Sequence, residues 1–219
     1  MRMTTLDSAV DRDWENLAPD LRECGEIAGM RLSQVLADAV LNASNFLFTQ
    51  AMQSLTPIER DGWVEAADMA RSMRLGVGQA FLRQFQLRYA QACRQGMMVG
   101  TPSYSVFPGQ EQYDAPKPAE SNFLGLFRQY VAWDGLLGLN RCYAALLANP
   151  SLDPFESPVG PSILESAIVA SLRFPVGHEV ARQRVLDAVF RELLGKVNLL
   201  YRDLTSFMIA LGFVKSGVV

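Results

Sequence analysis

The sequence is poor in the side chains from which metal sites and catalytic sites are most often built. Histidine occurs once, as His178, and the three cysteines, Cys24, Cys93 and Cys142, are far apart with no C-x-x-C pair. Structural zinc requires four such ligands, and di-iron bundles carry Glu-x-x-His pairs. Neither pattern occurs, so we expect no metal site and no cofactor.

The same scarcity limits nucleophilic catalysis. A thiol nucleophile needs a neighbouring base, and His178 shows no sign of serving one of the cysteines. We expect the cysteines to act as small apolar side chains and His178 to be a capping or surface residue. Gly76-x-Gly78 completes neither the dinucleotide-binding pattern nor the phosphate-loop pattern.

Long hydrophobic runs are also absent. No apolar stretch approaches the roughly 20 residues needed to span a bilayer, and Met1–Asn16 contains acids but no apolar core like that of a signal peptide. An odd number of dispersed cysteines is typical of reduced thiols in a cytosolic protein. We therefore expect a cytoplasmic protein without a membrane span.

Acidic residues are missing from one part of the chain. The formal net charge is −3, which argues against nucleic acid as a general partner. Between Met69 and Gln110, however, there is no acid and there are five arginines: Arg71, Arg74, Arg83, Arg88 and Arg94. These arginines form the candidate surface for an anion or an acidic partner. The alternative is that Phe81, Phe85 and Tyr89 belong to the core and the arginines lie at its rim.

Helical periodicity is the strongest positive signal. Eight apolar residues near the C-terminus follow steps of four and three without a break: Leu186, Phe190, Leu193, Val197, Leu200, Leu204, Phe207 and Leu211. This spacing places them on one stripe of an α-helix. Leu194, Tyr201 and Met208 widen the stripe to that of a bundle helix. We expect this helix-packing seam to be covered by other helices, within the molecule or in a second copy.

The whole pattern predicts an all-α fold, an elongated bundle of about five helices. Three long helices are expected at roughly 20–52, 57–95 and 178–213. Two shorter helices are expected from Ser121 to Asn149 and from Ser162 to Arg173. The domain prediction is a polar N-terminal tail at 1–19 followed by one helical domain at 20–219, which includes an irregular Pro/Gly-rich connector at 96–120.

Local signals support these boundaries. Thr56-Pro57-Ile58-Glu59 and Ser162-Ile163-Leu164-Glu165 have the pattern of a capping box, in which a hydroxyl and a glutamate satisfy the first amides of a helix. Gly76 and Gly78 lie inside the second long helix. They predict either a bend or a close approach of another backbone.

Two segments carry a family resemblance. The first runs from Leu21-Arg22-Glu23-Cys24 through Met30-Arg31-Leu32-Ser33 to Phe46-Leu47-Phe48. The second begins at Ser157-Pro158-Val159-Gly160-Pro161 and closes with Ala210-Leu211-Gly212-Phe213-Val214. Both resemble the N-terminal part of an uncharacterised family of large proteobacterial proteins (domain of unknown function 1631), some labelled thymidine phosphorylase.

The resemblance covers roughly two thirds of the chain, with Ser157 where the family usually has asparagine. It implies a short stand-alone member with a helical fold in a bacterial cytoplasm, and it brings no catalytic residue to transfer. The phosphorylase label finds no support, because the sequence has no Gly-rich phosphate loop and no Lys/His/Ser constellation.

We expect a non-enzymatic helical module for protein–protein interaction or scaffolding that associates with itself as a homodimer or with a protein partner. Long apolar faces and nine methionines able to adapt to partners favour this function. One alternative is an anion-responsive regulator that binds a nucleotide, nucleic acid or phosphorylated partner through the arginine-rich stretch. Another is an enzyme with a helical pocket closed by the 96–120 connector.

Overall fold

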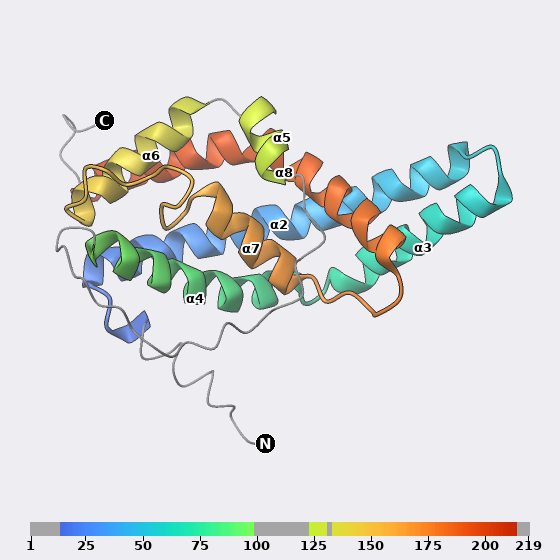
Figure 1. Ribbon diagram of the computed structural model, residues 1–219, viewed down its shortest axis with the longest axis horizontal. Helices are drawn as coiled ribbons and strands as arrows, with labels where there is room; N and C mark the ends of the chain where they lie inside the picture. The colour runs from blue at the N-terminus through green and yellow to red at the C-terminus, as the bar shows by residue number, and fades with distance from the viewer. Residues whose placement is uncertain (1–13, 99–122, 131–132, 214–219) are drawn as a thin grey trace, which may run out of the picture.

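The structure, a computed structural model, describes residues 14–98, 123–130 and 133–213. Within these residues there are seven α-helices and no strand (Figure 1). The helices are α2 (Pro19–Gln53), α3 (Pro57–Met73), α4 (Val77–Met98), α5 (Phe123–Tyr130), α6 (Trp133–Leu146), α7 (Pro161–Ser171) and α8 (Glu179–Ala210). The all-α prediction is confirmed, whereas the predicted number of about five helices is wrong.

Two of the expected helices are divided. The helix expected at 57–95 is interrupted by a turn at 74–76, which separates α3 from α4. A Cβ atom on Gly76 would meet no atom within 4 Å, so this glycine lies at a bend, whereas a Cβ atom on Gly78 would lie 3.7 Å from the Ser33 backbone carbonyl oxygen, so a backbone does approach there. The helix expected from Ser121 corresponds to α5 and α6, while Ser121 itself lies outside the described residues.

The two predicted capping boxes have different outcomes. The Thr56 hydroxyl accepts a hydrogen bond from the Glu59 backbone N–H (3.3 Å), as the sequence predicted. The Ser162 cap is wrong, because α7 begins at Pro161 with Gly160 as its N-cap. A Cβ atom on Gly160 would lie 2.4 Å from the Phe155 carbonyl oxygen, so the chain turns tightly there and the helix starts one residue earlier.

The architecture is organised around α2. Helices α3 and α4 both run antiparallel to it, α3 beside its C-terminal half and α4 beside its N-terminal half (Figure 1). The Ser44 hydroxyl of α2 donates to the Ala67 carbonyl of α3 (3.2 Å), and the Tyr89 hydroxyl of α4 donates to the Leu21 carbonyl of α2 (2.7 Å). Helix α8 packs against α2, α3 and α6, and α7 packs against α4. A thick body results, from which the end of the α2–α3 hairpin projects as an arm.

The predicted helix-packing seam forms part of the core. Six of its residues are buried, where α8 packs against α2 and α6: Leu186, Phe190, Leu193, Val197, Leu200 and Leu204. The last two differ. Phe207 is half-buried beneath Arg31, and Leu211 is exposed because α8 ends at Ala210. Gly212, with φ of +76°, then turns the chain, as glycine does after many helices.

The expected N-terminal tail and connector are largely outside the described residues. Of the tail at 1–19, Leu17 is buried and the Trp14 ring lies 5.7 Å from the Tyr89 ring. Of the connector at 96–120, the structure describes only its first residues, which end α4. The division into tail and single domain stays a prediction.

Close packing of α2 against α4 depends on two glycines one turn apart. A Cβ atom on Gly25 would lie 2.7 Å from ring atoms of both Trp14 and Tyr89, and one on Gly29 would lie 3.1 Å from the Phe85 ring. The aromatic rings of α4 therefore rest directly on the backbone of α2. Larger residues at these positions would separate the helices.

Replacing Gly25 by alanine is expected to lower the free energy of unfolding by about 1–3 kcal/mol, because two rings must move to admit one methyl group. Gly195→Ala is the matched control. No atom lies within 4 Å of a Cβ atom at that helical position, so the variant is expected to gain up to about 1 kcal/mol of stability. Urea unfolding of both variants measures the contrast. Equal or greater stability of Gly25→Ala would contradict the packing described here.

Candidate functional site

The five arginines predicted as an anion surface are divided between the α3 and α4 regions and differ in exposure. Arg71 and Arg74 are exposed near the end of α3, and Arg83 is exposed on α4. Arg88 is half-buried and donates to the Gln84 backbone carbonyl (3.0 Å) and to Oε1 of the same residue (2.6 Å). Burial lowers the pKa of the Arg88 guanidinium from its ordinary value. Arg94 is half-buried one turn before the end of α4.

The aromatic residues among these arginines lie in the core. Phe81, Phe85 and Tyr89 are all buried, with neighbouring ring centroids 5.6 and 5.5 Å apart. Their steps of four residues place them on the side of α4 that faces α2. The aromatic stripe is therefore a packing surface, and its three rings are not exposed for a ligand to stack on.

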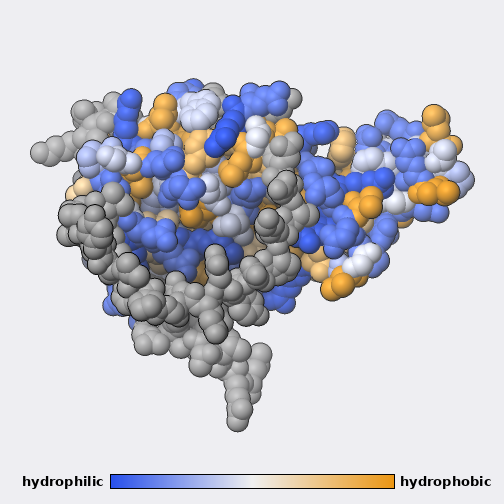
Figure 2. Space-filling view, viewed as in Figure 1, coloured by the Kyte–Doolittle hydropathy of each residue, from blue (hydrophilic) through white to orange (hydrophobic). Residues whose placement is uncertain are grey.

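Large apolar side chains are exposed at the end of the α2–α3 hairpin. Four large side chains there face solvent, with the following exposed fractions: Phe48 47%, Met52 70%, Leu55 96% and Ile58 88%. Figure 2 shows hydrophobic residues at the outer end of the arm. We call these four residues the apolar tip. Exposure of several large apolar groups at one end of a molecule is typical of interaction sites.

The sequence analysis missed the apolar tip, although the chain carries a signal for it. No charged residue occurs between Asp38 and Glu59. The buried positions in this part of the hairpin are already filled mostly by alanine: Ala39, Ala43, Ala51, Ala66, Ala67 and Ala70. Since small residues occupy much of the inside, only some of the larger apolar residues, such as Val40 and Leu47, are buried there, and four others are left on the outside.

Helix α8 packs against part of the hairpin with buried apolar residues, and several of its polar side chains add contacts there. The Arg184 guanidinium lies 4.1 Å above the Trp63 ring, and Arg191 lies 5.4 Å from the Phe46 ring centroid. The Asn42 amide donates to Glu192 Oε2 (3.2 Å). These contacts fix the hairpin against the body at about the level of Trp63, and the apolar tip extends beyond them (Figure 1).

His178 is a surface residue at the start of α8. It occupies the N-cap position without a side-chain capping bond, and its Nδ1 contacts the Glu65 carboxylate on α3. Both side chains are about half exposed. The pair adds a further link between α8 and the hairpin, of the kind that contributes little free energy in water.

The three cysteines converge in the core although they are distant in sequence. Cys24, Cys93 and Cys142 come from α2, α4 and α6, and all are buried free thiols close to Tyr143. Burial raises the pKa of Cys24 to about 12 and that of Cys93 to about 12. A thiol with such a pKa is protonated at neutral pH and is a poor nucleophile. The cluster therefore has the properties of packing, not of thiol chemistry.

Burial also raises the pKa of Tyr89 and Tyr143 well above the ordinary value. Folding thus keeps these phenols and the thiols protonated at pH values where the unfolded chain loses their protons. The free energy of unfolding is expected to stay level up to about pH 8.5 and to fall above about pH 9, by up to about 1.4 kcal/mol per pH unit for each such group.

Urea unfolding at pH 7.5, 8.5 and 10 checks this alkaline loss of stability. A variant with all three cysteines replaced by alanine is the control, and its loss is expected to begin about one pH unit higher because only tyrosines remain. A midpoint that does not change through pH 10, or native thiols alkylated as fast as free cysteine, would contradict the buried cluster.

The described residues contain neither a metal-ligand cluster nor a membrane-spanning helix. No group of three or more His, Cys, Asp or Glu side chains among them is arranged to hold a metal ion. No helix in the same ranges is both long enough and apolar enough to cross a membrane.

Comparison of the chain with protein-family models, with curated proteins and with solved structures finds no match. The resemblance to the uncharacterised proteobacterial family therefore stays a prediction.

Proposed function

We propose that this protein is a helical protein–protein interaction module of a bacterial cytoplasm that associates with itself through the apolar tip of the α2–α3 hairpin. The observation that carries the proposal is the exposure of Phe48, Met52, Leu55 and Ile58 on an arm that projects from the body. Burying such side chains against a second molecule is favourable by about 25 cal/mol for each Å² of apolar surface removed from water.

The chemistry of the apolar tip favours a second copy of the same chain as the occupant. In a two-fold symmetric dimer each residue near the axis meets its own counterpart, so a charged residue there would face a like charge. The segment between Asp38 and Glu59 has no charge and meets this requirement. Two hairpins packed tip to tip would cover each other's apolar residues.

Contacts within the α2–α3 hairpin stabilise its shape even when no second molecule covers the apolar tip. Alanines fill its interior, the Ser44–Ala67 hydrogen bond links its two helices, and the Thr56 cap fixes its turn. A preformed surface loses little conformational entropy on binding, which favours association. This supports a docking function for the arm.

Light scattering at high micromolar concentration tests the proposal. The unmodified protein is expected to be a dimer, and the Leu55→Glu/Ile58→Glu variant a monomer, because like charges would face each other in the interface. The charges should weaken the dimer by about two orders of magnitude or more. Both side chains are almost fully exposed, so the monomer should fold normally, as circular dichroism can check.

Val176→Glu is the matched control, since Val176 is 98% exposed but lies in the turn before α8 and outside the apolar tip. This variant is expected to dimerise like the unmodified protein. The proposal would be overturned if the unmodified protein were strictly monomeric. It would also be overturned if Val176→Glu weakened the dimer as much as Leu55→Glu/Ile58→Glu does.

A further inference from the structure

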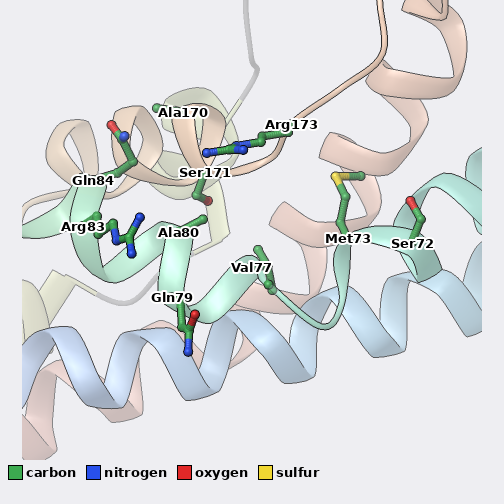
Figure 3. A pocket seen from close by; sticks show the side chains of 11 residues that line it. Ser72, Met73, Val77, Gln79, Ala80, Arg83, Gln84, Ala170, Ser171 and Arg173 are labelled. Carbon is green, nitrogen blue, oxygen red and sulfur yellow. The ribbon is translucent and has the colours of Figure 1, made fainter. Parts of the chain in front are cut away.

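A second surface feature is separate from the apolar tip. At the junction of α3 and α4 a groove of about 440 Å³ opens toward the end of α7 (Figure 3). Its walls include the last residues of α3, the first two turns of α4, and the chain around Ser171 and Arg173. The volume lies within the range of small-molecule sites, about 300–1,000 Å³.

The groove is lined by two positive charges and no acidic residue. Arg83 extends from α4 and Arg173 from the chain just after α7, with Ser171 between them in the view of Figure 3. Neither guanidinium forms a hydrogen bond or an ion pair with the residues that the structure describes. Some other arginines do have acidic partners: Arg31 pairs with Asp203 (3.8 Å), and Arg202 contacts Asp134. The two charges in the groove are therefore available to a ligand.

Neutral donors lie beside these charges. Gln79 and Gln84 both line the groove. Oε1 of Gln84 accepts a hydrogen bond from Arg88 (2.6 Å), which leaves the NH₂ of that amide as a donor for another group. Arg88, although half-buried and outside the lining, therefore orients a groove residue. The hydroxyls of Ser72 and Ser171 donate to carbonyls of their own helices and leave their oxygens as acceptors.

A second groove of the same volume, about 440 Å³, shows that this lining is not a general property of the surface. It lies at the end of α6 and is lined by Arg141 with three alanines and Pro150. It has one cation and no side-chain amide. The contrast identifies the groove at α4 as the one with the composition of an anion site.

We propose that the groove between α4 and α7 binds a phosphate-bearing small molecule, whose phosphate group is held by Arg83 and Arg173. Two guanidinium groups match the charge of a phosphate and offer paired N–H donors to its oxygens. The Gln79 and Gln84 side chains would contact the rest of the ligand. This site does not depend on self-association and would be present in a monomer.

Calorimetric titration with pyrophosphate, and separately with inorganic phosphate, tests the site. Pyrophosphate is expected to bind one site per chain, and Arg83→Gln and Arg173→Gln are each expected to weaken its binding by about tenfold or more, the effect of losing a hydrogen bond to a charged group. Arg141→Gln, in the second groove, is the matched control and is expected to bind like the unmodified protein. Thermal unfolding of each variant without ligand verifies that it is folded.

Three outcomes would overturn the proposal. The first is no binding of either anion at millimolar concentration. The second is an equal loss in all three arginine variants, which would indicate attraction to the general surface charge. The third is binding of a phosphoserine peptide without binding of pyrophosphate, which would make the ligand a phosphorylated protein. None of these outcomes bears on the apolar tip, which the light-scattering variants test separately.

Discussion

The length of α2 is the constraint on which the rest of the structure depends. Its 35 residues extend about 52 Å, whereas α4, with 22 residues, extends about 33 Å. One partner helix of this length cannot cover α2, so the chain uses α3 and α4 in succession along the same side. The break at Gly76 allows the two helices to follow α2 separately. The ends of α2 and α3 that extend beyond the body form the projecting arm.

The two halves of α2 are packed by opposite means. In the N-terminal half, glycines at 25 and 29 accept the large rings of α4, so the small residues are on α2 and the large ones on its partner. In the C-terminal half, both helices contribute small residues, and Ala43 and Ala67 are both fully buried. Close packing with mostly small side chains gives a slender hairpin. It also leaves Met52 and Ile58 with no apolar neighbour to cover them, which links the fold to the proposed function.

Sequence periodicity was sufficient to predict the all-α class and most of the buried face of α8. Leu186, Phe190 and Leu204 are buried as their spacing predicted, because a regular stripe on one helix needs only a neighbour to cover it. Helix ends were less predictable. The Ser162 cap failed because the backbone of Phe155 approaches Gly160, a contact between residues whose relative position depends on the folded turn.

The functional surfaces were harder to predict for the same reason. Arg173 is far from Arg83 in sequence, and only the packing of α7 against α4 brings both into one groove. The charge-free segment between Asp38 and Glu59 was visible, but periodicity alone does not show that Phe48 and Met52 face solvent. Conversely, the run of arginines suggested one surface, whereas its members belong to two helical regions and differ in exposure.

The central claim is that the arm ends in a surface that a second copy covers. Hydrogen–deuterium exchange of the full chain at low and high protein concentration tests it most directly, because amide protection reports where structure is shielded. The account predicts that amides around Phe48–Ile58 exchange more slowly at high concentration, while those of α6 and α7 exchange at the same rate in both. Exchange in the arm that does not change with concentration, or slowing confined to the body, would contradict the account.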